Sequence, residues 1–96
     1  MEGFVDKPDP RINAALVTGS ATRTGKALAL WLASQGIRVA VHYRSSADAA
    51  RETQAECNAL ATGCVLVQGD LTQAAEAARV VQEAHEKLGG LQLLVN

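Results

Sequence analysis

The residues best suited to chemistry form one short segment near the N-terminus, bounded by glycines. It reads Thr18-Gly19-Ser20-Ala21-Thr22-Arg23-Thr24-Gly25 and separates an apolar run from a helix-like stretch, Lys26 to Gln35. A strand that turns through glycines into a helix forms a phosphate site, because the helix N-terminus presents free N–H groups and a positive dipole end. We therefore predict a nucleotide site here. Its candidate residues are Gly19, Ser20, Arg23, Thr24 and Gly25.

Length, composition and charge exclude several classes of function. The chain has 96 residues, which make one small domain at most, and 48% of them are hydrophobic, as a packed core requires. A formal net charge of -1 gives no basic surface, so we predict no nucleic-acid partner. No apolar run is long enough to span a bilayer, so we predict no membrane partner.

The remaining compositional signals concern the N-terminus and the cysteines. Residues 1–13 are polar at their start, include both prolines and lack a signal-peptide core, so we predict a flexible lead-in. The two cysteines, Cys57 and Cys64, have neither disulfide-motif nor metal-site spacing, and we interpret them as small core residues. A reduced, cytoplasmic protein without a metal site is the simplest interpretation.

Short apolar segments alternate with helix-like stretches along the rest of the chain. The strand candidates are Ala14–Thr18, Arg38–His42, Cys64–Gln68 and Leu91–Val95. The helical stretches run from about Thr24 to Gln35, from about Ser46 to Ala61, and from an N-cap at Thr72 to Gly89-Gly90. This order predicts an α/β fold, a Rossmann-type doubly wound parallel sheet, of which residues 14–96 supply the first four strands.

Each helical stretch has a predicted buried face. The expected core positions are Leu28, Trp31 and Leu32 in the first, Ala50, Thr53, Cys57 and Leu60 in the second, and Ala77, Val80, Ala84 and Leu88 in the third. We also expect Glu83 and Lys87 to pair on the outer side of the third helix.

The glycine segment departs from the G-x-G-x-x-G dinucleotide fingerprint, because Gly19 and Gly25 are separated by five other residues. Thr18, Gly19 and Gly25 instead resemble the T-G-x-x-x-G-x-G pattern of the short-chain dehydrogenase/reductase family. Arg23 stands where that pattern has its central glycine. An arginine at this place is similar to the pteridine reductase branch of the family.

Three further segments carry the resemblance, which extends from Ala14 to Asn96. His42-Tyr43-Arg44-Ser45-Ser46 ends the second strand, where the family discriminates NAD from NADP. Gly69-Asp70-Leu71 ends the third strand, where the resemblance implies that Asp70 and Leu71 hold the adenine. Leu94-Val95-Asn96 resembles the start of the family's L-V-N-N-A element.

The end of the second strand favours a phosphorylated cofactor. NAD enzymes place an acid there to bind the ribose 2′-OH, whereas this chain has Tyr43 and Arg44, and no acid before Asp48. Arginine and hydroxyl groups attract a 2′-phosphate through charge-assisted hydrogen bonds. We therefore predict NADP(H), with Arg44, Ser45 and Ser46 at the 2′-phosphate and Tyr43 at the adenosine end.

The resemblance implies an NADPH-dependent reductase acting on a small-molecule carbonyl or pterin C=N bond. The family's catalytic tyrosine and lysine lie beyond the fourth strand, and Tyr43, the single tyrosine, has Ala47 four residues later. No catalytic residue is therefore expected in this chain. Two alternatives stay open: a non-catalytic NADP(H)-binding sensor module, and an inactive fragment.

Plainer interpretations of single residues also stay open. The glycine turn could hold no ligand, Arg23 could be an ordinary surface residue, Arg44 and Ser46 could be loop and cap residues, and Asp70 could be a turn residue. The fourth strand would leave an apolar edge bare, so we interpret the chain as a piece of a larger polypeptide or as completed by a second chain. The resemblance implies a homo-oligomer, commonly a tetramer.

Overall fold

The computed structural model describes residues 9–96. Most of the expected lead-in, residues 1–8, lies outside this range. Its described part, residues 9–13, contains a turn in which Ile12 N–H donates to the Asp9 carbonyl at 2.9 Å. The Arg11 side chain pairs with the Asp9 carboxylate across the same turn.

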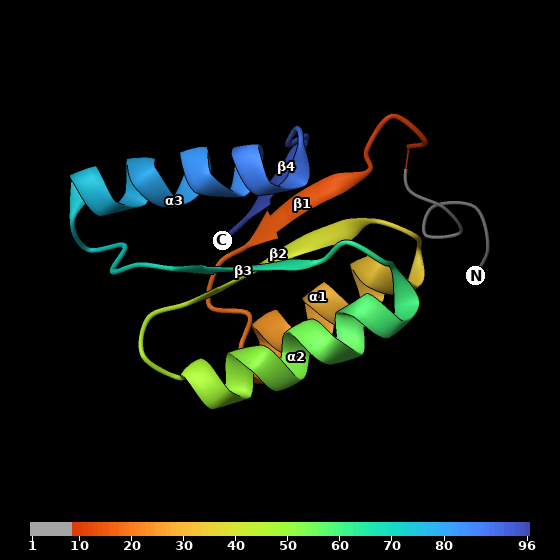
Figure 1. Cartoon of the computed structure of the whole chain (residues 1–96), viewed down its shortest axis with the longest axis horizontal. Helices are drawn as coiled ribbons and strands as arrows, with labels where there is room; N and C mark the ends of the chain where they lie inside the picture. The colour runs from red at the N-terminus through yellow and green to blue at the C-terminus, as the bar shows by residue number, and fades with distance from the viewer. Residues whose placement is uncertain (1–8) are drawn as a thin grey trace.

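Strands and helices alternate from Ala14 onward, as the sequence predicts. The elements are β1 (Ala14–Val17), α1 (Arg23–Ser34), β2 (Arg38–Tyr43), α2 (Ala47–Leu60), β3 (Val65–Gln68), α3 (Ala74–Leu88) and β4 (Leu93–Val95). The four strands pair in parallel in the order β3-β2-β1-β4, which is the first half of a Rossmann sheet. Helices α1 and α2 cover one face of the sheet and α3 covers the other (Figure 1).

The two central strands are buried on both faces, and their side chains divide between two cores. Ala15 and Val17 of β1 point toward α1 and α2. Ala14 and Leu16, which alternate with them, point toward α3. All four are at most 1% exposed, so β1 is held firmly at the centre of the sheet. The residues that follow β1 therefore leave the sheet from a fixed point.

The predicted buried face of α1 is wrong in part. Trp31 is 44% exposed and Leu28 is also exposed, whereas Leu32 is buried together with Ala29 and Ala33. Two alanines one turn apart let α1 lie close to the sheet, and that spacing leaves no room for an indole between helix and strands. In α2, Ala50, Thr53 and Cys57 are buried as expected, but Leu60 at the end of the helix is exposed.

The third helix matches its predicted face and differs at its start. Val80, Ala84 and Leu88 are buried, with Ala77 half-buried, and Lys87 pairs with Glu83 at 2.9 Å. The N-cap position is Gln73 rather than Thr72. Thr72 instead donates from its N–H and its hydroxyl to Asp70 Oδ1, at 3.0 and 2.7 Å, which keeps it in the preceding turn.

Strand β1 ends one residue earlier than predicted, and β3 and β4 begin later because side chains bind the backbone near their starts. The Cys64 N–H, just before β3, donates to Asn58 Oδ1 at 2.9 Å. Before β4, Gln92 Oε1 accepts from the N–H groups of Asn13 and Ala14, at 3.0 Å each. Among the helices described here, none has the length and apolar character needed to cross a membrane.

Candidate functional site

A cavity of about 410 Å³ opens where β1, β2 and β3 end. In open α/β sheets, ligands bind outside the carboxyl ends of the strands, near the point where the strand order reverses. Here the order reverses at β1, which has β2 and β3 on one side and β4 on the other. The cavity is lined by Thr18, Gly19, His42, Arg44, Gly69, Asp70, Leu71 and Thr72.

The turn after β1 depends on its two glycines for different reasons. Gly19 has a φ of 59°, in the left-handed region that side chains disfavour. Gly25 lies against the turn itself, because a Cβ there would be 2.9 Å from Ser20 Cα and closer still to the Gly19 carbonyl oxygen. The missing side chain of Gly25 thus allows α1 to approach the turn.

Arg23 is the one non-glycine residue with positive φ among residues 9–96, at 57°. A left-handed backbone costs an ordinary residue about 1–2 kcal/mol. The exposed arginine therefore occupies a conformation that suits the glycine of the family pattern, and it places a cation at the start of α1.

The N-terminus of α1 is suited to an anion. Its N-cap residue, Thr22, makes no side-chain capping bond, and its first turn holds no acidic residue. Thr24 and Gly25 belong to this first turn, whose N–H groups have no partner within the helix. The helix dipole and these donors favour a phosphate group at this end.

Ser20 lies beneath the turn rather than at the cavity. Its side chain is fully buried, and Oγ donates to the Val17 carbonyl at 2.7 Å. The same oxygen accepts the N–H of His42 at 3.1 Å, and Ser20 N–H donates to the His42 carbonyl at 3.0 Å. Ser20 therefore joins the turn to β2, and its direct contact with a cofactor stays a prediction.

His42 lines the cavity but is not among the predicted site residues, and the same is true of Thr18, Gly69 and Thr72. His42 is 4% exposed, and its Nδ1 accepts the N–H of Gly19 at 2.9 Å. Its Nε2 lies 2.9 Å from the carbonyl oxygen of Gly69. The sequence held a signal for this position, because a histidine ends a buried parallel strand whose two neighbouring strands both continue into glycine turns.

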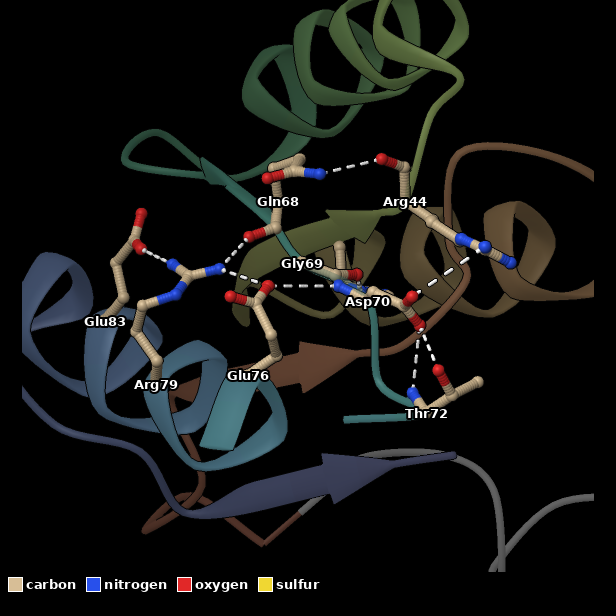
Figure 2. A network of polar contacts seen from close by, with 9 residues as sticks. Arg44, Gln68, Gly69, Asp70, Thr72, Glu76, Arg79 and Glu83 are labelled. Carbon is tan, nitrogen blue, oxygen red and sulfur yellow. Dashed lines mark hydrogen bonds and ion pairs between the residues drawn. The ribbon is translucent and has the colours of Figure 1, made fainter. Parts of the chain in front are cut away.

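Arg44 and Asp70 face each other across the cavity, with Arg44 Nη2 3.7 Å from Asp70 Oδ2 (Figure 2). Hydrogen bonds from the Thr72 hydroxyl and N–H lower the pKa of the Asp70 carboxyl, and the Arg44 charge adds to this effect. The Arg44 side chain is 70% exposed, so the ion pair is weak and the guanidinium is accessible to another anion.

A second polar cluster stabilises the turn after β3. Arg79 Nη2 donates to the Gln68 carbonyl at 2.6 Å and to Glu76 Oε1 at 3.2 Å, and Glu76 Oε1 also accepts the Asp70 N–H at 3.3 Å. Arg79 Nη1 donates to Glu83 at 2.7 Å (Figure 2). Helix α3 thus holds the backbone that carries Asp70.

The cavity brings together four of the predicted residues: Gly19, Arg44, Asp70 and Leu71. The others lie outside its lining and are Ser20, Arg23, Thr24, Gly25, Tyr43, Ser45 and Ser46. Tyr43 is half-buried and packs against the core between the sheet and helices α1 and α2, whereas Ser45 and Ser46 are exposed. Ser46 occupies the N-cap position of α2 without a side-chain capping bond.

Cys57 and Cys64 are free thiols, and both are buried, as expected of core residues. Within residues 9–96, no three His, Cys, Asp or Glu side chains are grouped so that they could hold a metal ion.

The sequence model of the short chain dehydrogenase family matches residues 13–96. The chain belongs to the short chain dehydrogenase family. The fold agrees with this membership, since the four parallel strands and the glycine turn stand in the order that the resemblance implies.

Known members of the family resemble the chain over most of its length. It is 35% identical over 80 residues, 83% of this chain and 30% of the relative, to short chain dehydrogenase/reductase AacuN of Aspergillus aculeatus. It is 34% identical to 3-oxoacyl-[acyl-carrier-protein] reductase FabG of Staphylococcus aureus, over 86% of this chain and 34% of the relative.

A solved structure from Burkholderia cenocepacia, with bound NADP, superposes with a TM-score of 0.81 at 31% identity. The match covers 86% of this chain and 32% of that one. The chain thus spans about a third of the length of these relatives.

Proposed function

We propose that this chain is the NADP(H)-binding part of a short chain oxidoreductase. The observation that carries the proposal is the cavity at the carboxyl ends of the strands, which has Arg44 at the end of β2 and no acid on that strand. The donor set fits the cofactor, because its three phosphate groups need cations and N–H donors. When bound, NADPH supplies the hydride.

The cavity and the residues beside it each suit one part of the cofactor. We assign the pyrophosphate to the uncapped start of α1, with Arg23 adding positive charge. The 2′-phosphate is assigned to Arg44, with Ser45 and Ser46 next to it in the loop. Leu71 supplies an apolar wall and Asp70 a hydrogen-bond acceptor for the adenine.

The charges near Arg44 favour a phosphate over a hydroxyl group. Asp70 is the acid paired with Arg44, and it already accepts two hydrogen bonds from Thr72. The next acid along the chain, Asp48, pairs with Arg51 at 2.6 Å. Arg44 is therefore free to turn to a 2′-phosphate, whereas no carboxylate at the end of β2 would accept a 2′-hydroxyl.

The substrate class we propose is a carbonyl compound or a pterin with a reducible C=N bond. The name of the Staphylococcus aureus relative, a 3-oxoacyl reductase, supports carbonyl reduction. Arg23 at the place of the central glycine supports the pterin alternative, because it carries the resemblance to pteridine reductases. The residues of this chain would bind and orient the cofactor in either reaction.

We also propose that more polypeptide covers the outer edge of β4. Within the described residues, β4 pairs with β1 alone, and its Leu94 is 47% exposed. An apolar strand edge of this kind favours pairing with another strand. A longer chain or a homo-oligomer would supply that strand.

The cofactor assignment is tested by replacing Arg44 with aspartate and measuring the dissociation constants of NADPH and NADH by fluorescence titration. We expect NADPH to bind about tenfold to a hundredfold more weakly, since a charge-assisted hydrogen bond is lost and a repulsion added. NADH lacks the 2′-phosphate, and it should bind equally well or more tightly because the new carboxylate can accept a hydrogen bond from its 2′-hydroxyl.

The matched control is Arg51→Asp, which makes the same charge change at an exposed arginine of α2. This variant should bind both cofactors as the unaltered chain does. Equal weakening of NADPH and NADH by Arg44→Asp would contradict the 2′-phosphate assignment.

A further inference from the structure

His42 connects the two glycine turns that border the cavity. Its ring lies between Gly19, in the turn after β1, and Gly69, in the turn after β3. It is the side chain that touches both turns through hydrogen bonds in the part of the chain described. His42 is 4% exposed, and its ring has these two backbone groups as hydrogen-bond partners.

The two contacts require a single protonation state. Gly19 contributes an N–H, so Nδ1 must accept and cannot carry a hydrogen. Gly69 contributes a carbonyl oxygen, so Nε2 must carry the hydrogen and donate it. The other neutral tautomer, and equally the imidazolium, would set an Nδ1–H against the Gly19 N–H. Both contacts can form together when the ring carries its hydrogen on Nε2.

The backbone of His42 strengthens the same connection. Its N–H donates to Ser20 Oγ and its carbonyl accepts the Ser20 N–H. On the other side, the Gly69 N–H donates to the carbonyl of Tyr43 at 3.1 Å. The end of β2 thus holds both neighbouring turns, and the imidazole is the part that reaches between them.

We propose that His42 is a positioning residue for the cofactor: its Nε2-protonated imidazole sets the spacing between the pyrophosphate turn at Gly19 and the adenosine wall at Gly69-Asp70-Leu71. This inference rests on the proposed NADP(H) site. An apolar residue of similar size would fill the space but leave the Gly19 N–H and the Gly69 carbonyl without these partners.

Two conservative substitutions separate the two hydrogen bonds. In His42→Asn, the amide oxygen stands where Nδ1 stood, so it can accept from Gly19 but cannot reach Gly69. In His42→Gln, the amide nitrogen stands one atom farther out, where Nε2 stood, so it can donate to Gly69 but leaves Gly19 unpaired. His85→Gln, at an exposed histidine of α3, is the matched control.

The experiment titrates the full chain and these variants with two probes. NADPH engages both the pyrophosphate turn and the adenosine wall, whereas adenosine 2′-monophosphate engages the adenosine end alone. We expect His42→Gln to weaken NADPH about tenfold and to leave adenosine 2′-monophosphate within about twofold. His42→Asn should weaken both probes equally, by about tenfold, and His85→Gln should change neither.

A purely structural role for His42 predicts a different pattern. Both substitutions would then lower the unfolding temperature and weaken the two probes in the same proportion, which would overturn the proposal. Nitrogen NMR of the imidazole gives a second test that needs no variant to fold. A hydrogen found on Nδ1 of His42 in the unaltered chain would equally overturn it.

Failure of the proposed function has its own signature. If the unaltered chain binds neither probe, the NADP(H) site is wrong and the positioning role is wrong with it. If it binds both probes and the two His42 variants bind them as it does, the site stands and the positioning role alone is overturned.

Discussion

The turn after β1 and the loop after β2 border the same cavity but are held in different ways. The turn is held by sterics and buried hydrogen bonds, since Ser20 is fully buried and Gly25 touches the backbone of Gly19. The loop, residues 44–46, is exposed. It is tied by the 2.8 Å hydrogen bond from Gln68 to the Arg44 carbonyl and by the ion pair of Arg44 with Asp70.

This difference separates two properties of a cofactor site. A turn held by packing is preorganised, so its shape is part of the folded state and serves any dinucleotide alike. A loop that offers exposed charges can adjust, so it selects between cofactors at small cost to stability. Substitutions in the turn should therefore change stability, and substitutions in the loop should change cofactor preference.

The largest effect on stability is expected from Gly25→Ala. The added methyl group meets the backbone of Gly19 and Ser20, which cannot move as a flexible side chain would. We expect the free energy of unfolding, measured with urea, to fall by about 3 kcal/mol. Gly36→Ala is the control, because it meets open space at a φ of 85° and should cost only about 1 kcal/mol. Equal losses would show that close packing at Gly25 is unimportant.

Ser20→Ala should have the next largest effect. It removes the hydroxyl that donates to the Val17 carbonyl and accepts the His42 N–H, both in a buried position. We expect a loss of about 1–2 kcal/mol in unfolding free energy, with NADPH and NADH affinities reduced in the same ratio. Ser45→Ala, in the exposed loop, should leave stability unchanged. A change in cofactor preference with Ser20→Ala would break the distinction between turn and loop.

Arg23→Gly should have a smaller effect and the opposite sign. Glycine relieves the left-handed strain at φ 57°, although it adds entropy to the unfolded chain. Thermal unfolding should therefore show stability unchanged or raised by up to about 1 kcal/mol. NADPH binding should weaken because a cation is lost. A clear loss of stability would mean that Arg23 supports the fold rather than the site.

The smallest effect is expected from Asp70→Asn. Hydrogen bonds from Thr72 lower the pKa of the Asp70 carboxyl in the folded chain. The Asp70 carboxylate therefore stabilises the fold at pH values above the pKa that this carboxyl has in the unfolded chain. This contribution is lost as the pH falls through the lower pKa that the carboxyl has in the folded chain. Unfolding temperatures measured from about pH 7 to about pH 3 should fall less for Asp70→Asn than for the unaltered chain. Parallel curves would contradict this account.

Local patterns were sufficient for the order of elements and for the first turn. The roles of Gly19 and Gly25 could be predicted from the sequence because a tight turn from a strand into a helix requires glycine at such positions. The predicted burial of Trp31 was wrong because the helical period shows which residues share a face, but it does not show how close that face lies to the sheet. The prediction of Thr72 as the N-cap of α3 was wrong because threonine, a good N-cap residue, can equally form hydrogen bonds to Asp70 two residues before it.

The amino-acid sequence alone was sufficient to predict a parallel α/β sheet, a glycine turn suited to phosphate and a second strand that ends without an acidic residue. These features depend on neighbours in the sequence, through backbone conformation, periodicity and charge. The folded arrangement was needed to show that His42 reaches both turns, that Ser20 faces inward and that Arg44 meets Asp70. Those contacts join residues more than twenty positions apart or depend on burial, and parallel strand pairing creates them by bringing the strand ends to one edge.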